Sequence, residues 1–62
     1  MPNDLELVRI YERSTWGAGF ICDAIQALRD DPSKDVTKDL GEALLLLTKA
    51  AAEIQQILSV RQ

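Results

Sequence analysis

Histidine is absent from this 62-residue sequence, and cysteine occurs once, as Cys22. Without histidine the chain lacks the commonest general base and the commonest metal ligand of proteins, and its hydroxyl side chains have no imidazole to activate them. A single cysteine cannot form a disulfide within the chain, and we expect it to be a small buried hydrophobic residue. We therefore predict that the protein is not an enzyme and holds no metal and no cofactor.

Basic residues and long apolar runs are also scarce. Seven Lys and Arg face ten Asp and Glu, which gives a net charge of −3, whereas a nucleic-acid-binding protein usually has the opposite balance. The longest leucine run, Leu44 to Leu47, has charges close to both ends and falls short of the ~20 apolar residues of a membrane span. No signal-peptide pattern or lipidation motif is visible. We expect a soluble cytoplasmic protein with no membrane partner.

Two long helical patterns meet at one break. The first helix is expected over about 4–30, with Asn3 as its N-cap and Glu6 reaching back to the cap amide. Pro32 ends this helix and suits the first position of the next one, which Asp31 or Ser33 would cap. The turn is therefore expected over about 31–33 and the second helix over about 34–60. So short a connection predicts one domain, residues 1–62, folded as an all-α antiparallel two-helix hairpin.

Apolar residues recur in both segments at the first, fourth and fifth positions of a heptad, as in helices packed in a bundle. Small residues alternate with large ones, which lets helices interdigitate in layers. Each glycine inside a helix costs about 1 kcal/mol relative to alanine. Two accounts stay open, a close helix crossing at Gly17 or a kink at residues 17–19. The large residues expected in the core or a dimer interface are Leu7, Ile10, Ile21, Leu28, Leu40, Leu44, Leu47, Ile54 and Leu58.

Further apolar residues, among them Val8, Val36, Leu46 and Val60, flank this stripe. A chain of about 60 residues buries only roughly 60% of its surface on folding, so one hairpin is marginal alone. Large apolar patches usually mark interfaces. We expect two hairpins to pair about a two-fold axis as a four-helix bundle. In this architecture, a small acidic hairpin with large and small residues layered in heptads, the whole chain resembles the plasmid repressor-of-primer family, although no sequence motif is shared.

Trp16 and Phe20 fall opposite the apolar stripe, on the face that should meet water. Arg9 and Arg13 share that face, so the four residues form a line at helical spacing. Trp and Arg are among the residues most enriched at binding hot spots. Two explanations stay open: the aromatic pair contacts another molecule, or it is buried within the homodimer. We predict a homodimeric module that binds another protein and modulates it, as an adaptor, inhibitor or anti-activator.

Two other functions stay open. An RNA-binding regulator would place Arg9 and Arg13 on phosphates and stack Trp16 or Phe20 on bases, although the acidic balance disfavours RNA as a partner. The chain could instead be a purely structural subunit of a larger assembly. Salt dependence separates RNA binding from protein binding, because phosphate contacts weaken steeply as salt is added.

Overall fold

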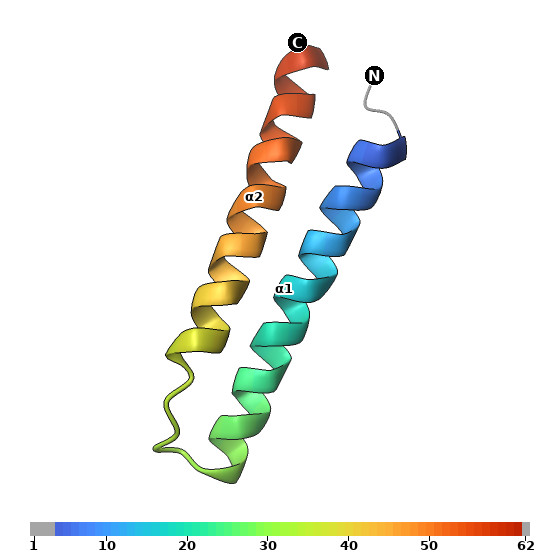
Figure 1. The fold of residues 1–62 in the computed structure, drawn as a ribbon. Coiled ribbons are helices and arrows are strands. Elements are labelled where there is room, and N and C mark those ends of the chain that lie inside the picture. Colours follow the sequence, from blue (N-terminus) through green and yellow to red (C-terminus); the bar gives the residue numbers. More distant parts are fainter. Residues whose placement is uncertain (1–3, 62) are drawn as a thin grey trace.

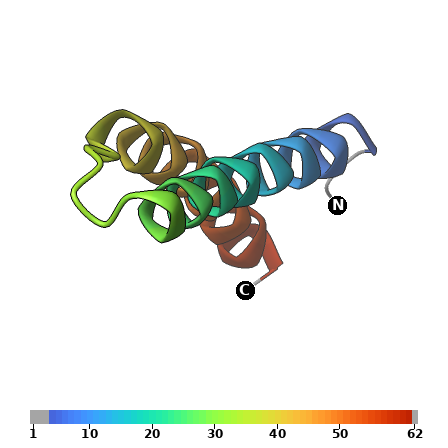
Figure 2. The same cartoon turned by 90° about the horizontal axis from the view of Figure 1, so that it is seen from below.

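The computed structural model describes residues 4–61 and consists of two helices joined by one connection (Figure 1). Helix α1 spans Asp4–Asp30 and helix α2 spans Thr37–Arg61. The helices lie side by side and antiparallel, and Figure 2 shows that their axes cross. The molecule is elongated, with extents of 46 × 17 × 13 Å. The prediction of an all-α helical hairpin is confirmed, and the N-cap predicted at Asn3 lies outside the described residues.

Helix α1 has charges suited to both of its ends. Asp4 and Glu6 lie in its first turn and Arg29 in its last turn, which complements the positive and negative ends of the helix dipole. The hydroxyl of Thr15 donates a hydrogen bond of 2.8 Å to the carbonyl oxygen of Tyr11 within the helix. The helix continues through residues 17–19 without a break. The two glycines in that stretch are therefore accommodated within one continuous helix.

The connection between the helices occupies residues 31–36 and is built on two aspartates. Asp31 Oδ1 accepts hydrogen bonds from the Ser33 backbone N–H at 3.1 Å and from the Ser33 hydroxyl at 2.8 Å. Asp35 Oδ1 accepts a hydrogen bond of 2.9 Å from the backbone N–H of Thr37 and so caps α2. Helix α2 thus begins three residues later than predicted, because Asp31 and Ser33 stabilise a turn instead of capping a helix.

These hydrogen bonds favour the charged form of both carboxyl groups. The side-chain and then the backbone hydrogen bond from Ser33 lower the pKa of Asp31 below its ordinary value. The corresponding hydrogen bonds from Thr37 lower the pKa of Asp35. Both aspartates are exposed, and the connection is therefore held by local hydrogen bonds at the surface.

Small residues close the hairpin. Gly17 and Ala24 of α1 are buried, as are Ala43 and Ala50 of α2, and the three alanines are 1 to 3% exposed. A Cβ atom added at Gly17 would lie 2.8 Å from Leu47 Cγ, which is closer than carbon atoms pack. The absence of a side chain therefore permits the close crossing expected at Gly17. We call this contact the seam. It includes the buried small residues and the two half-buried isoleucines that lie in line with them at a spacing of seven residues. The residues of the seam are Ile10, Gly17, Ala24, Ala43, Ala50 and Ile57.

The large residues expected in the core lie beside the seam in the single chain. Ile10, Ile21 and Leu47 are half-buried. No large side chain of the described residues is fully buried. The small seam residues bring the two backbones close, which leaves the larger residues at the edges of the contact. The expected residues that are exposed are Leu7, Leu28, Leu40, Leu44, Ile54 and Leu58. Cys22 is exposed as well, contrary to the expectation that it is buried.

Candidate functional site

The geometry of an antiparallel helix pair gives the hairpin two different faces. Successive residues of an α-helix are about 100° apart around its axis. The residue after a seam residue therefore points to one side, and the residue before it points to the other side. Because α1 and α2 run in opposite directions, the residues that follow the seam lie on the same side of the hairpin in both helices.

One side is apolar along its length. The residues that follow the seam, or precede it by three positions, carry no charge, and their polar side-chain groups are the hydroxyls of Tyr11 and Ser14. Leu44 is 69% exposed and Tyr11 62% exposed, although both are large and apolar in most of their surface. We call this side the apolar face. Its exposed members are Leu7, Tyr11, Ala18 and Ile25 of α1 and Leu40, Leu44, Ala51, Ile54 and Leu58 of α2.

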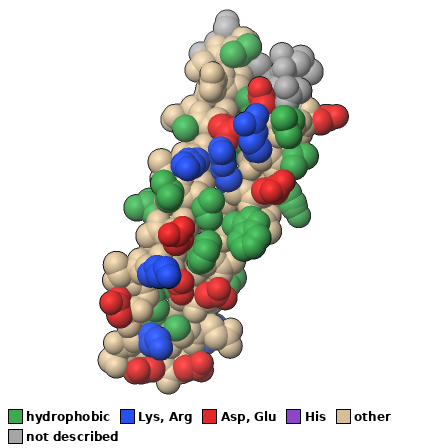
Figure 3. Space-filling view, viewed as in Figure 1, with side chains coloured by type: hydrophobic (Ala, Val, Ile, Leu, Met, Phe, Trp, Pro, Cys, Tyr) green, Lys and Arg blue, Asp and Glu red, His purple; other side chains and the backbone are tan. Residues whose placement is uncertain are grey.

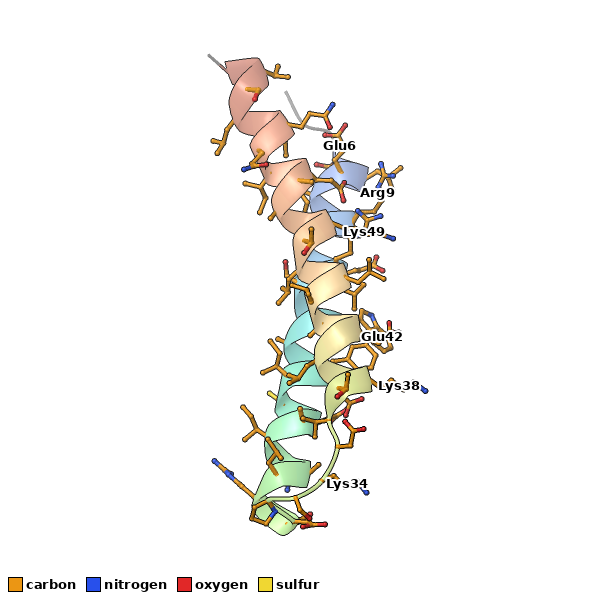
Figure 4. All side chains as sticks on the ribbon, turned by 90° about the vertical axis from the view of Figure 1, so that its left-hand side faces the viewer. Glu6, Arg9, Lys34, Lys38, Glu42 and Lys49 are labelled. Carbon is orange, nitrogen blue, oxygen red and sulfur yellow. The ribbon has the colours of Figure 1, made fainter. Side chains whose placement is uncertain are left out.

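The opposite side is charged. Lys and Arg side chains gather on it over one half of both helices, beside a group of hydrophobic side chains (Figure 3). In Figure 4 the labelled charges Arg9, Lys49, Glu42 and Lys38 follow one another along a single edge of the hairpin. We call this side the charged face. The residues that precede the seam on it are Arg9, Trp16 and Asp23 of α1 and Glu42, Lys49 and Gln56 of α2.

An ion pair joins the two helices at the border of the charged face. Arg13 Nη1 contacts Glu53 Oε1. Both side chains are half-buried, and the Glu53 oxygen is shielded from water with the guanidinium as its partner. In this register the two charges match, and removing either one would leave the other partly shielded and unmatched. The positive charge of Arg13 is therefore used within the hairpin.

Trp16 and Phe20 border an open hollow on the charged face. Its lining consists of Trp16, Gly19, Phe20 and Asp23. Trp16 is 65% exposed, and Phe20 is half-buried. Apart from its two neighbours in sequence and the backbone of its own helix, a Cβ atom added at Gly19 would meet no atom within 4 Å, so the glycine leaves open space in the hollow.

The four predicted site residues differ in their surroundings. Arg9 and Trp16 are exposed on the charged face, as the helical spacing predicted. Arg13 and Phe20 lie closer to α2 than an outer face would place them, since both are half-buried. Sequence reasoning missed Asp23, although it follows Trp16 by seven residues and therefore shares its side of the helix. It also missed Glu53, whose contact with Arg13 depends on the register between the helices.

Two further features of the described residues bear on function. Within residues 4–61, no three His, Cys, Asp or Glu side chains gather as they would around a metal ion. By length and composition alone, Thr37–Val60 of α2 is apolar enough to cross a membrane, and little of this stretch is buried in the hairpin. The stretch includes the leucines and the isoleucine that α2 contributes to the apolar face.

Comparison of the chain with protein-family models, with curated proteins and with solved structures gives no match. The two faces and the hollow are therefore the features of the chain that bear on its function.

Proposed function

We propose that this protein is a non-enzymatic, homodimeric helical module that binds another protein and modulates it. The observation that carries the proposal is the uncovered apolar face, to which both helices contribute along the length of the hairpin. Exposed apolar surface of this extent is unfavourable in water and usually marks an interface. A second copy of the same chain is the partner that is always available at an equal concentration.

The size of the apolar face suits a dimer. The hairpin measures 46 Å along its length and 17 Å across, and a stable interface takes about 800 Å² from each partner. Packing two such faces about a two-fold axis gives a four-helix bundle with the leucines and isoleucines inside. The small seam residues then lie within each hairpin, and the large residues lie between the hairpins.

The charged face remains outward in this arrangement and is available to a different protein. Trp16 is the chain's only tryptophan, and like Arg9, Asp23 and Glu42 it is one of the exposed residues that precede the seam on that face. An exposed tryptophan adds nothing to the seam, whereas in an interface it is a frequent hot spot. Trp16 and its neighbours are therefore the residues to which we assign partner binding.

Light scattering behind a sizing column tests the dimer. We expect twice the chain mass of 6.9 kDa at micromolar concentration and a melting temperature that rises with concentration, since association and folding are linked by mass action. A folded monomer would contradict the proposal. Adding neutral lipid vesicles to the same sample tests the other way to cover the apolar face, because co-sedimentation with them would show a lipid-bound chain instead of a dimer.

Affinity capture from the native host tests partner binding. Trp16→Ala should leave the dimer and its helical circular dichroism unchanged and should weaken the captured interaction by about 2 kcal/mol or more. Lys34→Ala, a change in the connection, is the control and should leave the interaction intact. Captured RNA in place of protein, with binding that falls steeply as salt rises, would support the RNA-binding alternative.

A further inference from the structure

We infer that the hollow on the charged face binds a cationic side chain, arginine or lysine, presented by the partner protein. This inference rests on the proposed function, since it names the chemistry of the partner. The hollow combines two aromatic residues, one carboxylate and one glycine. Each of the three kinds of group contributes a property that a guanidinium or ammonium group requires.

The aromatic residues supply the first property. The faces of tryptophan and phenylalanine rings are electron-rich and attract cations, tryptophan most strongly. Trp16 and Phe20 are four residues apart and therefore adjacent on one side of α1. Trp16 is largely exposed, so a ring face remains for a ligand to cover. A neutral apolar group would gain the burial but not this electrostatic attraction.

Negative charge supplies the second property. Asp23 lines the hollow, and Glu42 lies on the same face in the neighbouring helix (Figure 4). Arg13 is already paired with Glu53, and Asp23 is the one charged residue among the four that line the hollow, so the charge in direct contact with a ligand there is negative. An anion would be repelled there, whereas a cation gains an ion pair in addition to the ring contact.

Gly19 supplies the third property, which is room. It lines the hollow, and apart from its sequence neighbours and the backbone of its own helix, a methyl group placed on it would meet no atom within 4 Å. Lysine and arginine carry long methylene stems that lie along apolar surfaces while their charged ends remain polar. The bare backbone at Gly19 leaves space for such a stem in the hollow that Trp16 and Phe20 also line.

Titration of the full chain with three blocked amino-acid amides tests the inference. The probes are N-acetylarginine amide, its neutral analogue with norleucine, and its acidic analogue with glutamate, at constant ionic strength and in the millimolar range. The readouts are the fluorescence of Trp16 and the backbone amide shifts of the labelled protein. We expect saturable changes confined to residues near 16–23 with the arginine probe, and little or no change with the other two.

Two variants sharpen the test. Asp23→Asn should weaken arginine binding by about two- to fivefold, the scale of an exposed ion pair, whereas Asp30→Asn removes one charge from the same helix two turns away and should have no such effect. Gly19→Ala should weaken binding by filling the hollow while it raises helix stability, which separates a lost site from a damaged fold.

Three results would overturn the inference: equal binding of the norleucine probe, preferential binding of the glutamate probe, or no shifts near 16–23 with arginine. Each of these results would leave the proposed function standing, so failure of the cation site can be distinguished from failure of the module. A dimer that captures its partner through Trp16 but shows no preference for arginine would retain the module and refute the cation site. A chain that is monomeric and captures nothing would refute the module, whatever the probes show.

Discussion

The seam and the apolar face lie within the same two helices, yet one is closed and the other open. At the seam, Gly17, Ala24, Ala43 and Ala50 are buried, and the two backbones approach closely because nothing large separates them. On the apolar face, leucines and isoleucines of greater size remain in contact with water. In this two-helix protein the smallest apolar residues therefore form the contact between the helices. The larger residues then remain for a second contact.

A charge placed on the apolar face gives the largest expected effect. Leu44→Glu introduces a carboxylate at the most exposed leucine of the face proposed to be buried between hairpins. An unpaired buried charge costs roughly 3–5 kcal/mol, enough to dissociate the dimer and, in so small a protein, to unfold it. Light scattering and circular dichroism measure both outcomes.

The control for this change is Ala52→Glu, which adds the same charge to an exposed position of α2 away from both the seam and the apolar face. It should leave mass and helicity unchanged. If both variants had the same mass and helicity, a charge on the apolar face would cost no more than a charge elsewhere on α2, and the proposed dimer interface would be wrong.

Truncation of Leu47 comes next in size. Its side chain packs over Gly17 at the seam and borders the apolar face, so it serves both contacts. Leu47→Ala should cost roughly 2–5 kcal/mol, as for large-to-small changes in a core. The same substitution at the exposed Lys49 should change stability by no more than about 0.5 kcal/mol. Urea unfolding at one fixed protein concentration compares them, and equal losses would show that Leu47 is not a core residue of the dimer.

The same substitution, glycine to alanine, should change the stability of the protein in opposite directions at the seam and at the exposed surface of α1. Gly19→Ala adds a methyl group in open space and should stabilise the helix by up to about 1 kcal/mol. Gly17→Ala gains the same helix propensity but forces Leu47 to move, and overpacking of this kind costs about 1–3 kcal/mol. We expect a net loss at position 17. Thermal unfolding measures the difference, and stabilisation at both positions would contradict the close crossing.

Acid should produce the smallest of these effects. The hydrogen bonds from Ser33 and Thr37 lower the pKa values of Asp31 and Asp35 in the folded chain. The stability that these groups contribute is therefore fully present above the ordinary aspartate pKa of about 3.9 and is lost as pH falls through the lowered folded value. Asp35→Ala should remove part of this dependence below pH ~4. Unfolding measured across that range checks it, and an unchanged profile would contradict a capping role for Asp35.

The heptad pattern predicted the two helices because both amphipathic segments are long and regular. It did not predict which residues form the seam. Leu40, Leu44 and Leu58 dominate any count of apolar residues, whereas Ala24 and Ala50 contribute little to such a pattern, although they are the buried ones. The buried alanines are distinguished from the exposed leucines only by the close approach of the two helix backbones, which a pattern along one chain does not contain.

The boundary of α2 and the candidate site illustrate the same limit. Pro32 is compatible with a helix start or with a turn. Asp31 and Asp35 lie on either side of it, and the hydrogen bonds that they accept determine the residue at which α2 begins. Trp16 and Arg9 were placed correctly by helical spacing within α1. The Arg13–Glu53 pair could not be predicted, because it joins two helices whose register is set by the seam.

The connection over residues 31–36 also determines how the hairpin is expected to form in time. Seam positions near it, such as Ala24 and Ala43, are separated by a short loop, whereas Ile10 and Ile57 are far apart in sequence. Loop-closure entropy rises with the length of chain enclosed, so the contacts nearest the connection should form first and the pairing should extend outward. Such local topologies fold within microseconds to milliseconds. For the dimer that we propose, the encounter between two hairpins would then be the slow step at low concentration, and the refolding rate should increase with protein concentration.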